Sequence, residues 1–517
     1  MRYVIVTGGV LSGLGKGVTT ASIAKILQSM GYKITVIKID PYLNVDAGTM
    51  SPFEHGEVFV LSDGGEVDLD LGNYERFLNI DLTRDHNITT GKIYKAVIEK
   101  ERRGEYLGKT VQPIPHLTDE IKLQIRNVAE KYDFTIIEVG GTVGDIESMP
   151  FLEACRQLSG EESVVFVHVT LVPKLNVVGE QKTKPTQHSV KKLMGTGISP
   201  HIIVGRSEKP LYKKTKKKIA QFCNVREDHV ISNYDIDDIY TAPLLLNEQK
   251  MGQKVIDKFG LRRKPKLKNW KSIISRECKK TVTLAMVGKY MDLHDSYISI
   301  EEALKHCSYY TGTKVDTLWL ESERCTDKDL EDANGVLVPG GFGVRGTEEK
   351  IKAIRYAREN KIPFLGICLG FQLATVEYAR SIGLTNANST EFDDTDEPVI
   401  DLLPEQKKIE NMGGTMRLGA YKILLDKDST AYKLYESTEI YERHRHRYEV
   451  NPEYIDTLTE KELRFTGQSE DGRMELLELG EHPFFMGTQY HPEFTSRVER
   501  PSPVFMGLVK AMAEEKI

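Results

Sequence analysis

The chain has 517 residues, with 70 lysines and arginines against 76 aspartates and glutamates, so its formal net charge is −6. Charged residues make up 28% and hydrophobic residues 40%, a balance that excludes wholesale disorder. The slight acidity argues against a nucleic-acid binder that works through overall charge. At about 100–200 residues per domain, the length predicts two or three domains.

Six cysteines are scattered along the chain without a CxxC pair, so neither a zinc framework nor a disulfide-stapled domain is indicated. The N-terminus enters a strand pattern at once, without the charged and apolar regions of a signal peptide. The longest strongly apolar stretch, from Val164 to Val172, is far shorter than the ~18–20 residues of a membrane helix. We expect a cytoplasmic protein with reduced thiols that binds neither membrane nor nucleic acid.

The first half alternates short β-branched runs with helical patterns. A strand is predicted over residues 3–7, a helix over 19–30 and a second strand over 33–39. Continuous apolar runs, typical of strands buried on both faces, lie at 134–139 and 163–169, and shorter strands are predicted at 202–204 and 230–232. This alternation predicts an α/β fold with a doubly wound parallel sheet.

The composition changes after Phe259. Residues 261–270 are basic, contain Pro265 and show no sustained apolar period, which predicts a linker. Strand signals return at 281–287, 335–338, 363–367 and 485–489. We therefore expect a first domain over residues 1–262, a linker over 263–280 and a second α/β domain over 281–517.

A glycine-rich turn follows the first strand, at residues 8–17. Consecutive glycines let backbone N–H groups face an anion, and the following helix N-terminus adds a favourable dipole. Lys16 is placed to reach the outer phosphates of a nucleotide. The strict P-loop pattern is not met, because Val10 replaces its first glycine and Gly17 its hydroxyl residue. We interpret the segment as a phosphate-binding loop rather than a tight turn that merely starts a helix.

Metal-bridged triphosphate needs carboxylates opposite such a loop. Glu66, Asp68 and Asp70 alternate along a stretch predicted to be extended, and so would share one face. This pattern fits metal ligation and a solvated edge strand about equally well. Glu138 ends a buried strand, where a lone acid is costly and therefore indicates a function.

Two further clusters of charged and polar residues lie at or after the ends of predicted strands. Lys38 and Asp40 lie on one face at the end of the next predicted strand. Residues 182–187 supply two ammonium groups and hydroxyls in a segment bent by Pro185, which suits a second polyphosphate, although short Lys/Thr clusters are commonly plain surface. The lysine run at 213–218 is typical of a solvated helix face.

In the second half, residues 363–372 predict a strand, a Gly366-Ile-Cys368-Leu-Gly370 turn and a helix, the thiol version of a nucleophile elbow. Small flanking residues permit the strained turn, and the helix N-terminus favours the thiolate. The N–H of Leu369 can form half of an oxyanion hole, and the turn at Gly341 the other half.

A nucleophilic thiol needs a base, and His491 with Glu493 two residues later supplies a base and its orienting carboxylate. A single histidine is usually structural, but the pairing with an elbow cysteine favours catalysis.

Residues 442–448 need a separate interpretation. Their two histidines could indicate a metal, but three interleaved arginines would repel a cation, which favours a carboxylate-binding strip.

In combination, these motifs resemble the CTP synthase family, and the resemblance covers nearly the whole chain. It is carried by the segments 12–17, 38–44, 51–57, 68–72, 138–147 and 182–187 in the first half, and 366–372, 442–448 and 491–494 in the second. The second half resembles class I glutamine amidotransferases, whose triad is Cys-His-Glu. The family fold is a P-loop-like synthetase domain joined by a linker to an amidotransferase domain.

The resemblance implies a two-part reaction. ATP with Mg²⁺ phosphorylates the uracil O4 of UTP, glutamine is hydrolysed through a thioester at Cys368, and the released ammonia attacks C4 to give CTP. GTP as an allosteric activator, inhibition by CTP, a homotetramer and filaments in several lineages are implied in the same way.

The resemblance also implies roles for individual residues. The catalytic triad would be Cys368, His491 and Glu493, and Mg²⁺ would be held by Asp70 and Glu138. ATP would be bound by Gly13, Leu14, Gly15, Lys16, Gly17, Val18, Asp70, Tyr234, Asp235 and Ile236. UTP or CTP would be bound by Ser12, Asp145, Ile146, Glu147, Lys182, Thr183, Lys184, Pro185, Thr186, Gln187 and Lys218. Glutamine would be bound by Gly341, Leu369, Gly370, Phe371, Gln372, Glu391 and Arg447.

Two alternatives differ in class. One is another glutamine-dependent ligase that phosphorylates a carboxylate, which residues 182–187 disfavour because such an acceptor needs no second triphosphate site. The other is an inactive filament protein, which is disfavoured by the presence of Cys368, His491, Glu493, Lys16, Asp70 and Glu138.

Overall fold

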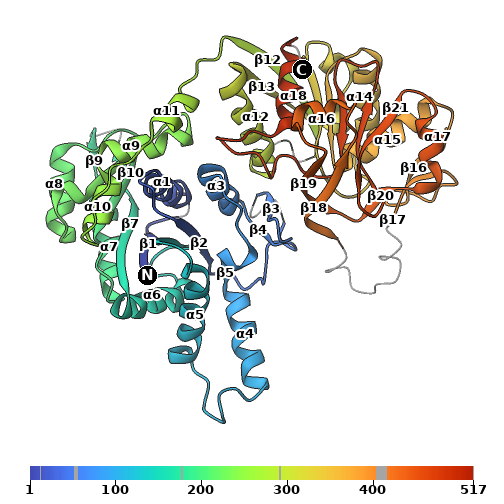
Figure 1. Cartoon of the computed structure of the whole chain (residues 1–517). Helices are drawn as coiled ribbons and strands as arrows, with labels where there is room; N and C mark the ends of the chain where they lie inside the picture. The colour runs from blue at the N-terminus through green and yellow to red at the C-terminus, as the bar shows by residue number, and fades with distance from the viewer. Residues whose placement is uncertain are drawn as a thin grey trace. The chain divides into compact units, whose positions relative to one another are not determined.

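The computed structural model describes residues 1–11, 13–51, 56–175, 179–289, 291, 293–402 and 416–515. Its contacts divide the chain into two units (Figure 1). Unit 1 consists of Met1–Ala47 and Asp70–Ile274, and unit 2 of Gly48–Leu69 and Ser275–Ile517. Within the described ranges, every helix is too short or too polar to cross a bilayer.

A seven-stranded, fully parallel sheet forms the centre of unit 1, in the order β11-β10-β7-β1-β6-β2-β5. The chain winds to both sides of β1, which confirms the predicted doubly wound fold and puts the strands' carboxyl ends at one edge. The strands are β1 (Arg2–Gly8), β2 (Ile34–Asp40), β5 (Asn87–Thr89), β6 (Phe134–Val139), β7 (Ser163–Leu171), β10 (Ile202–Ser207) and β11 (Val230–Tyr234).

Helices cover both faces of this sheet. Tyr3 and Ile5 of β1 belong to the core that it shares with α4 (Thr90–Arg102), α5 (Thr118–Ala129) and α6 (Met149–Glu161). The opposite face carries α1 (Lys16–Ser29), as Figure 1 shows. The remaining α-helices described in unit 1 are α3 (Leu69–Leu78, of which Leu69 belongs to unit 2), α7 (Lys184–Gly195), α8 (Lys213–Cys223), α9 (Ala242–Glu248), α10 (Met251–Asp257) and α11 (Lys268–Ile274).

The expected linker over residues 263–280 is folded over much of its length. Residues 268–274 form α11, and the buried Trp270 donates a hydrogen bond from Nε1 to the carbonyl of Tyr240 at 2.9 Å. Arg263 lies over the ring of Tyr32, 4.4 Å from its centroid. The segment is held by three buried residues that share one helical face, namely Leu267, Trp270 and Ile274. The many basic residues around them hide this apolar pattern in the sequence.

Unit 2 is built on a nine-stranded mixed sheet in the order β13-β12-β14-β15-β23-β22-β21-β18-β19. The first five strands are parallel to one another and the others antiparallel. They are β12 (Lys280–Gly288), β13 (Thr313–Glu321), β14 (Gly335–Val338), β15 (Phe364–Ile367), β18 (Arg417–Leu425), β19 (Glu439–His446), β21 (Leu463–Ser469), β22 (Met474–Leu479) and β23 (Phe485–Thr488). A small sheet contains β16 (Asn388–Ser389), β17 (Pro398–Leu402) and β20 (Tyr448–Val450).

Helices flank this sheet as well, so the second predicted α/β fold is confirmed. The longer ones are α12 (Ile298–Thr311), α14 (Thr347–Glu359), α15 (Leu369–Ser381) and α18 (Pro503–Met512); the shorter ones are α13 (Asp327–Leu330), α16 (Thr430–Tyr435) and α17 (Ile455–Thr459).

A hairpin from the first half of the sequence belongs to unit 2, whereas the sequence placed all of residues 1–262 in the first domain. It consists of β3 (Val58–Val60) and β4 (Glu66–Asp68). Arg443 of β19 donates a hydrogen bond to the carbonyl of Val60 at 3.0 Å, and Arg445 donates one to Glu66 Oε1 at 2.8 Å. A two-stranded hairpin is not stable alone, so these contacts with β19 decide where it belongs.

The expected common face of Glu66, Asp68 and Asp70 is wrong. β4 ends at Asp68 and α3 begins at Leu69, so Asp70 lies in the first turn of a helix. Glu66 pairs with Arg445 in unit 2, whereas Asp70 belongs to unit 1. The alternating acidic residues therefore extend across the boundary between β4 and α3, and do not share one face.

Candidate functional sites

The thiol of unit 2 occupies the predicted elbow. Cys368 lies between β15 and α15 with φ 51°, a conformation that is strained for a residue other than glycine. A β-carbon at Gly366 would lie 2.6 Å from the carbonyl carbon of Gly370, and one at Gly370 would lie 2.1 Å from the carbonyl oxygen of Val338. The two glycines are thus what allows the turn to bring the thiol above the N-terminus of α15.

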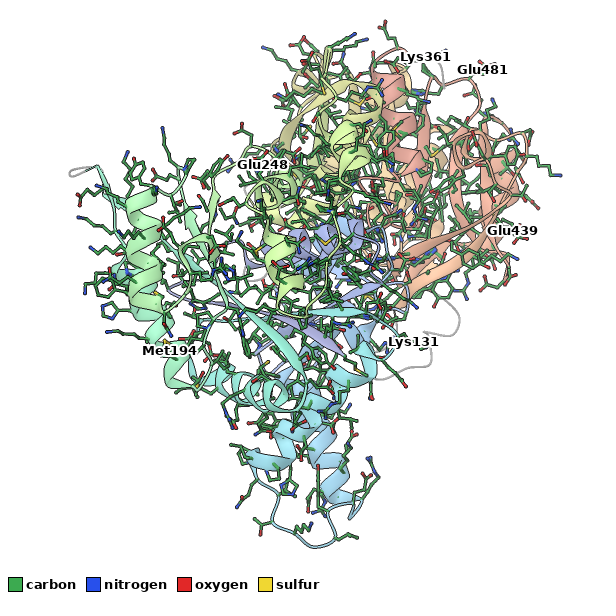
Figure 2. All side chains as sticks on the ribbon, turned by 60° about the vertical axis from the view of Figure 1, so that its left-hand side comes forward. Lys131, Met194, Glu248, Lys361, Glu439 and Glu481 are labelled. Atoms are coloured by element: carbon green, nitrogen blue, oxygen red, sulfur yellow. The ribbon has the colours of Figure 1, made fainter. Side chains whose placement is uncertain are left out.

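The carboxyl ends of two neighbouring parallel strands bring the catalytic groups together. Cys368 follows β15 and His491 follows β23, and these strands are paired. At the opposite edge, Lys361 Nζ donates a hydrogen bond to the carbonyl of Glu481 at 3.5 Å, joining the segments that enter the same two strands (Figure 2). The strand pair is therefore tied at its entry, while the predicted catalytic residues lie at its exit.

The three predicted catalytic residues of unit 2 form one buried group. His491 Nδ1 lies 2.7 Å from Glu493 Oε1. Burial by itself lowers the pKa of His491, but the Glu493 carboxylate and the Cys368 sulfur outweigh it and raise the pKa to about 10. A β-carbon at Gly340 would lie 2.9 Å from His491 Cε1 and 3.6 Å from Cys368 Cβ. The arrangement suits a thiolate–imidazolium pair held by a carboxylate.

A cavity of about 340 Å³ opens beside the triad within unit 2. Two lysine side chains line it together with Cys368 and His491. Lys289 donates hydrogen bonds to the carbonyls of Phe342 and Gly343, at 2.9 and 2.7 Å. Lys350 is buried, and this burial, reinforced by Lys289, lowers its pKa to about 7. The sequence interpretation missed both lysines, because neither belongs to a recognisable motif.

The residues expected to bind glutamine lie around the same turn. Gly343 donates its N–H to Glu391 Oε1 at 2.7 Å; burial raises the pKa of Glu391, while that hydrogen bond, Lys289 and Arg447 oppose the rise. A β-carbon at Gly341 would lie 3.3 Å from Leu369 Cδ2, so the two expected halves of the oxyanion hole adjoin.

Two of the expected glutamine ligands have buried side chains. Gln372 donates from Nε2 to the carbonyl of Tyr448 at 3.0 Å and to Gln489 Oε1 at 3.2 Å. The ring of Phe371 is packed in the core. A contact between Phe371 and glutamine therefore requires its backbone. Gln489, which also donates to Cys368 Sγ at 3.7 Å, was missed although it precedes the catalytic histidine by only two residues.

The arginine–histidine strip at 442–448 is internally paired. His444, His446 and Glu475 present ligand atoms within 4.8 Å of one another, yet Arg417 Nη1 already donates to Glu475 Oε1 at 2.5 Å. Burial lowers the pKa of both histidines well below the ordinary value, so they are neutral. A guanidinium thus neutralises the carboxylate, and the strip's Arg445 forms an ion pair with Glu66 at 2.8 Å.

In unit 1 the predicted phosphate loop leads from β1 to α1. Gly15 has φ 74° at the helix start, and a β-carbon at Gly8 would lie 2.4 Å from Lys16 Cδ. Lys16 curls back over the strand end and donates from Nζ to the carbonyl of Gly141 at 3.1 Å. Ser12, the first residue expected to contact UTP or CTP, lies outside the described residues.

A cluster of opposite charges faces this loop. The Lys38 ammonium contacts Asp70, lies 3.2 Å from Asp40 Oδ1 and lies 3.9 Å from Glu138 Oε1. Burial and the charge of Asp70 raise the pKa of Glu138, while Lys38 and Lys16 oppose the rise. The two expected metal ligands therefore converge, with a lysine ammonium against them.

Close packing places this cluster next to the loop. A β-carbon at Gly17 would lie 2.5 Å from Asp70 Oδ1. Tyr74, in the same helix as Asp70, donates a hydrogen bond from its hydroxyl to Glu138 Oε2. Tyr74 was missed because nothing distinguishes this tyrosine from others until α3 packs against β6.

The segment expected to bind UTP lies at the end of β7, beside β1. Thr186 donates its hydroxyl to the carbonyl of Leu171 at 3.0 Å, and Gln187 donates from Nε2 to Thr183 Oγ1 at 2.9 Å. Lys182 lies 3.1 Å from Glu180. Among the described residues, the exposed Lys218 of α8 forms no hydrogen bond or ion pair with this segment.

The loop after β6 contains the remaining residues expected to bind UTP or CTP. Asp145 accepts a hydrogen bond from the N–H of Thr142 at 3.2 Å, and Ile146 and Glu147 are exposed. Val143 donates its N–H to the carbonyl of Gly8 at 2.9 Å, so this loop lies beside the end of β1.

The expected adenine-flanking residues follow β11. Asp235 lies 2.6 Å from Arg206, with the half-buried Tyr234 and Ile236 beside it in sequence. Asn233 donates to Thr19 Oγ1 of α1 at 3.3 Å, so the end of β11 adjoins the helix that follows the phosphate loop.

Comparisons with known proteins agree over both halves. The family model for the CTP synthase N-terminus matches residues 2–261, and that for class-I glutamine amidotransferase matches residues 292–511. A CTP synthase of Pyrococcus furiosus is 58% identical, covering 100% of this chain and 98% of that protein. One of Archaeoglobus fulgidus is 57% identical, covering 99% and 98%. A solved Trypanosoma brucei CTPS glutaminase domain with bound acivicin is 34% identical, covers 46% of this chain and 95% of that chain, and has a TM-score of 0.44.

Proposed function

The chain belongs to the CTP synthase family, and we propose on that premise that its two units divide one reaction between them. It is a glutamine-hydrolysing CTP synthase, a ligase of pyrimidine nucleotide biosynthesis. Residues 1–262 are assigned to the synthetase and residues 281–517 to the amidotransferase. Unit 2 releases ammonia from glutamine, and unit 1 uses ATP to activate UTP for amination.

In the proposed amidotransferase, the Cys368 thiolate attacks the carboxamide carbon of glutamine. The oxygen of the tetrahedral intermediate accepts hydrogen bonds from the backbone N–H groups of Gly341 and Leu369. His491 gives its proton to the leaving nitrogen, so that ammonia departs and a C–S thioester remains. A water then loses a proton to His491 and attacks the thioester, which releases glutamate and restores the thiolate. Glu493 holds the imidazole through Nδ1 during both steps.

Glutamine is held beside the thiol by the remaining proposed ligands. The Glu391 carboxylate suits its α-ammonium group and the Arg447 guanidinium its α-carboxylate. Gly370, Phe371 and Gln372 contribute from the first turn of α15, Phe371 through its backbone.

In the proposed synthetase, the γ-phosphoryl group of ATP moves to O4 of UTP, which makes phosphate the leaving group. Ammonia then attacks C4 and phosphate departs with O4, giving CTP. Lys16 neutralises charge on the transferred group, and the N–H groups from Gly13 to Val18 bind the phosphates. Tyr234, Asp235 and Ile236 flank the adenine.

UTP has its own proposed ligands. Lys182, Thr183, Lys184, Pro185, Thr186, Gln187, Lys218 and Ser12 bind it, and Asp145, Ile146 and Glu147 belong to the site at which CTP inhibits.

The acidic residues of unit 1 fit Mg²⁺, since Asp70 and the buried Glu138 both face the Lys38 ammonium, and burial together with the charge of Asp70 raises the pKa of Glu138. Asp70 and Glu138 would hold the ion through carboxylate oxygens, the donors that Mg²⁺ prefers. Bound there, Mg²⁺ neutralises charge on the β- and γ-phosphates of ATP.

Regulation and assembly follow from family membership as further proposals. GTP activates the enzyme, CTP inhibits it, and the active form is a cytoplasmic homotetramer. Filament formation depends on surface residues and stays a prediction.

The convergence of Cys368, His491 and Glu493 in a chain that also holds the lysine–carboxylate cluster supports this proposal most strongly. The test is an absorbance assay of uracil-to-cytosine conversion with UTP, ATP and Mg²⁺, run with glutamine plus GTP and, separately, with ammonium chloride. We expect conversion with both nitrogen sources. No conversion with either would contradict the proposal and favour a ligase that phosphorylates a carboxylate.

A further inference from the structure

A buried chain of three polar side chains crosses unit 1 behind the phosphate loop. The parallel register of β1 and β7 makes Thr7 and His168 neighbours. Thr7 Oγ1 lies 2.9 Å from His168 Nδ1, and Ser189 Oγ of α7 lies 2.7 Å from His168 Nε2. All three side chains are buried, so water does not satisfy these atoms. We refer to these residues as the Thr7–His168–Ser189 chain.

The imidazole at its centre is neutral. Burial, reinforced by the charge of Lys16, lowers the pKa of His168 to about 3. A neutral imidazole donates through one ring nitrogen and accepts through the other. A hydroxyl group can both donate and accept a hydrogen bond, so the two hydroxyls beside the ring can pair with its donor nitrogen and its acceptor nitrogen. His168 therefore links two elements without introducing a charge, which a lysine or carboxylate at this place could not do.

The phosphate loop rests directly on this chain. A β-carbon at Gly9 would lie 1.5 Å from Ser189 Oγ and 3.0 Å from His168 Nε2. Gly9 also donates its N–H to the carbonyl of Val169, the residue after the histidine, at 3.1 Å. The first turn of the loop is thus held against the Ser189 hydroxyl by backbone pairing on one side and by van der Waals contact on the other.

Ser189, at the Nε2 end of the chain, lies in the helix that begins with the proposed UTP ligands. Ser189 follows Pro185 by one helical turn, and Thr186 is anchored to the end of β7 through its hydroxyl. Met194 in the last turn of α7 is exposed (Figure 2). The N-terminal half of α7 is therefore the half that polar contacts bind to the sheet.

We propose that His168 is a positioning residue that fixes the phosphate loop and the first turn of α7 relative to each other, so that the ATP and UTP sites are aligned through the Thr7–His168–Ser189 chain. This inference rests on the proposed roles of the loop and of residues 182–187. His168 touches neither nucleotide. It acts through Thr7, at the end of the strand that leads into the loop, on its Nδ1 side, and through Ser189, against which Gly9 packs, on its Nε2 side.

The test measures KM for ATP, KM for UTP and kcat with ammonium chloride as nitrogen source. In His168→Ala we expect both KM values to rise about tenfold, the factor that corresponds to one lost buried hydrogen bond at each end. The amide of His168→Asn overlays Nδ1 and keeps the Thr7 contact, so mainly the KM for UTP rises. The amide of His168→Gln overlays Nε2 and keeps the Ser189 contact, so mainly the KM for ATP rises.

Two further variants separate positioning from folding. Ser189→Ala removes one hydroxyl without opening the core, and we expect it to reproduce the effect of His168→Asn. His201→Asn is the matched control, because His201 accepts the N–H of Phe166 at 3.1 Å near the opposite end of β7. It should leave both KM values unchanged.

The inference is overturned if His168→Ala and Ser189→Ala lower the thermal unfolding temperature but leave both KM values at the wild-type level. It is also overturned if the Asn and Gln variants shift the two KM values equally. Failure of the proposed function is distinct, since the wild-type enzyme would then convert no UTP.

Discussion

The thiol site of unit 2 and the lysine–carboxylate site of unit 1 are held in different ways. The thiol lies on a strained backbone that Gly366 and Gly370 permit, and its base is already paired with a carboxylate. In unit 1, Lys38, Asp70 and Glu138 lie in regular strands and a helix, and the Lys38 ammonium offsets part of the charge of the two carboxylates. A nucleophile can be activated before its substrate binds. In a polyphosphate site, by contrast, the charged side chains pair with one another until the ligand and its metal ion take the place of these ion pairs.

The largest expected effect separates the two sites completely. Cys368→Ala removes the proposed nucleophile of the amidotransferase, and glutamine-dependent CTP formation should fall by about 10⁴-fold or more. Ammonia-dependent formation should stay near wild type. Steady-state rates with each nitrogen source check this, with the exposed Cys278→Ala as control. Loss of both activities would contradict the division of labour between the two units.

The reciprocal change is Lys16→Ala. It removes the ammonium group of the phosphate loop, so CTP formation from either nitrogen source should fall by about 10²–10³-fold. Glutamine hydrolysis should persist. The exposed Lys217→Ala of α8 serves as the matched control. Unchanged turnover with ammonium chloride would contradict the phosphate-binding role of Lys16.

Chelation distinguishes the sites without mutation. Removing Mg²⁺ with EDTA should abolish ammonia-dependent CTP formation, because Asp70 and Glu138 bind nucleotide only through the ion. Basal glutamine hydrolysis should change less than about twofold, since the triad uses no metal. Glutamate release and CTP absorbance, measured in parallel, decide this. Equal loss of both activities would place a metal requirement in unit 2 as well.

The stabilisation that the pairing of His491 with Glu493 gives to unit 2 should depend on pH. The folded pKa of His491, about 10, lies above its ordinary value near 6.5, so its stabilising contribution is complete below pH 6.5 and is lost as the pH rises through 10. The free energy of unfolding should therefore fall by about 1–3 kcal/mol between pH 7 and pH 10. Denaturant unfolding of Glu493→Gln should show a shallower fall. An identical slope in both proteins would refute the pairing.

The smallest effect concerns the hairpin of unit 2. Glu66→Gln removes the charge that pairs with Arg445, and should weaken the attachment of residues 58–68 by about 1–2 kcal/mol. Hydrogen exchange of the hairpin amides measures this. Glu439→Gln is the control, because the pair of Glu439 with Lys422 at 3.2 Å is largely exposed. Equal exchange in wild type and Glu66→Gln would show that packing alone holds the hairpin.

Much of the architecture follows from local pattern. Apolar runs located the buried strands, and the predicted strand over 134–139 has the bounds of β6. The thiol elbow was recognisable because its glycines, its cysteine and the following helix are adjacent in sequence. His491 and Glu493 were recognisable for the same reason, since two residues along a chain cannot lie far apart.

Other features needed contacts between distant segments. The helix α11 was hidden in a basic stretch, and Asp70 was placed on a strand although it begins a helix. The hairpin formed by β3 and β4 belongs to unit 2 only because Arg443 and Arg445 bind it.

The amino-acid sequence by itself determined the two α/β folds, the phosphate loop, the thiol elbow and the family, because each is written in residues that are close along the chain. Only the tertiary structure shows which carboxylates contact Lys38, that a side chain at Gly340 would collide with His491, and that His168 joins Thr7 to Ser189. These depend on strand register and helix packing, which bring together residues up to 182 positions apart, as with Thr7 and Ser189. No local pattern encodes such a distance.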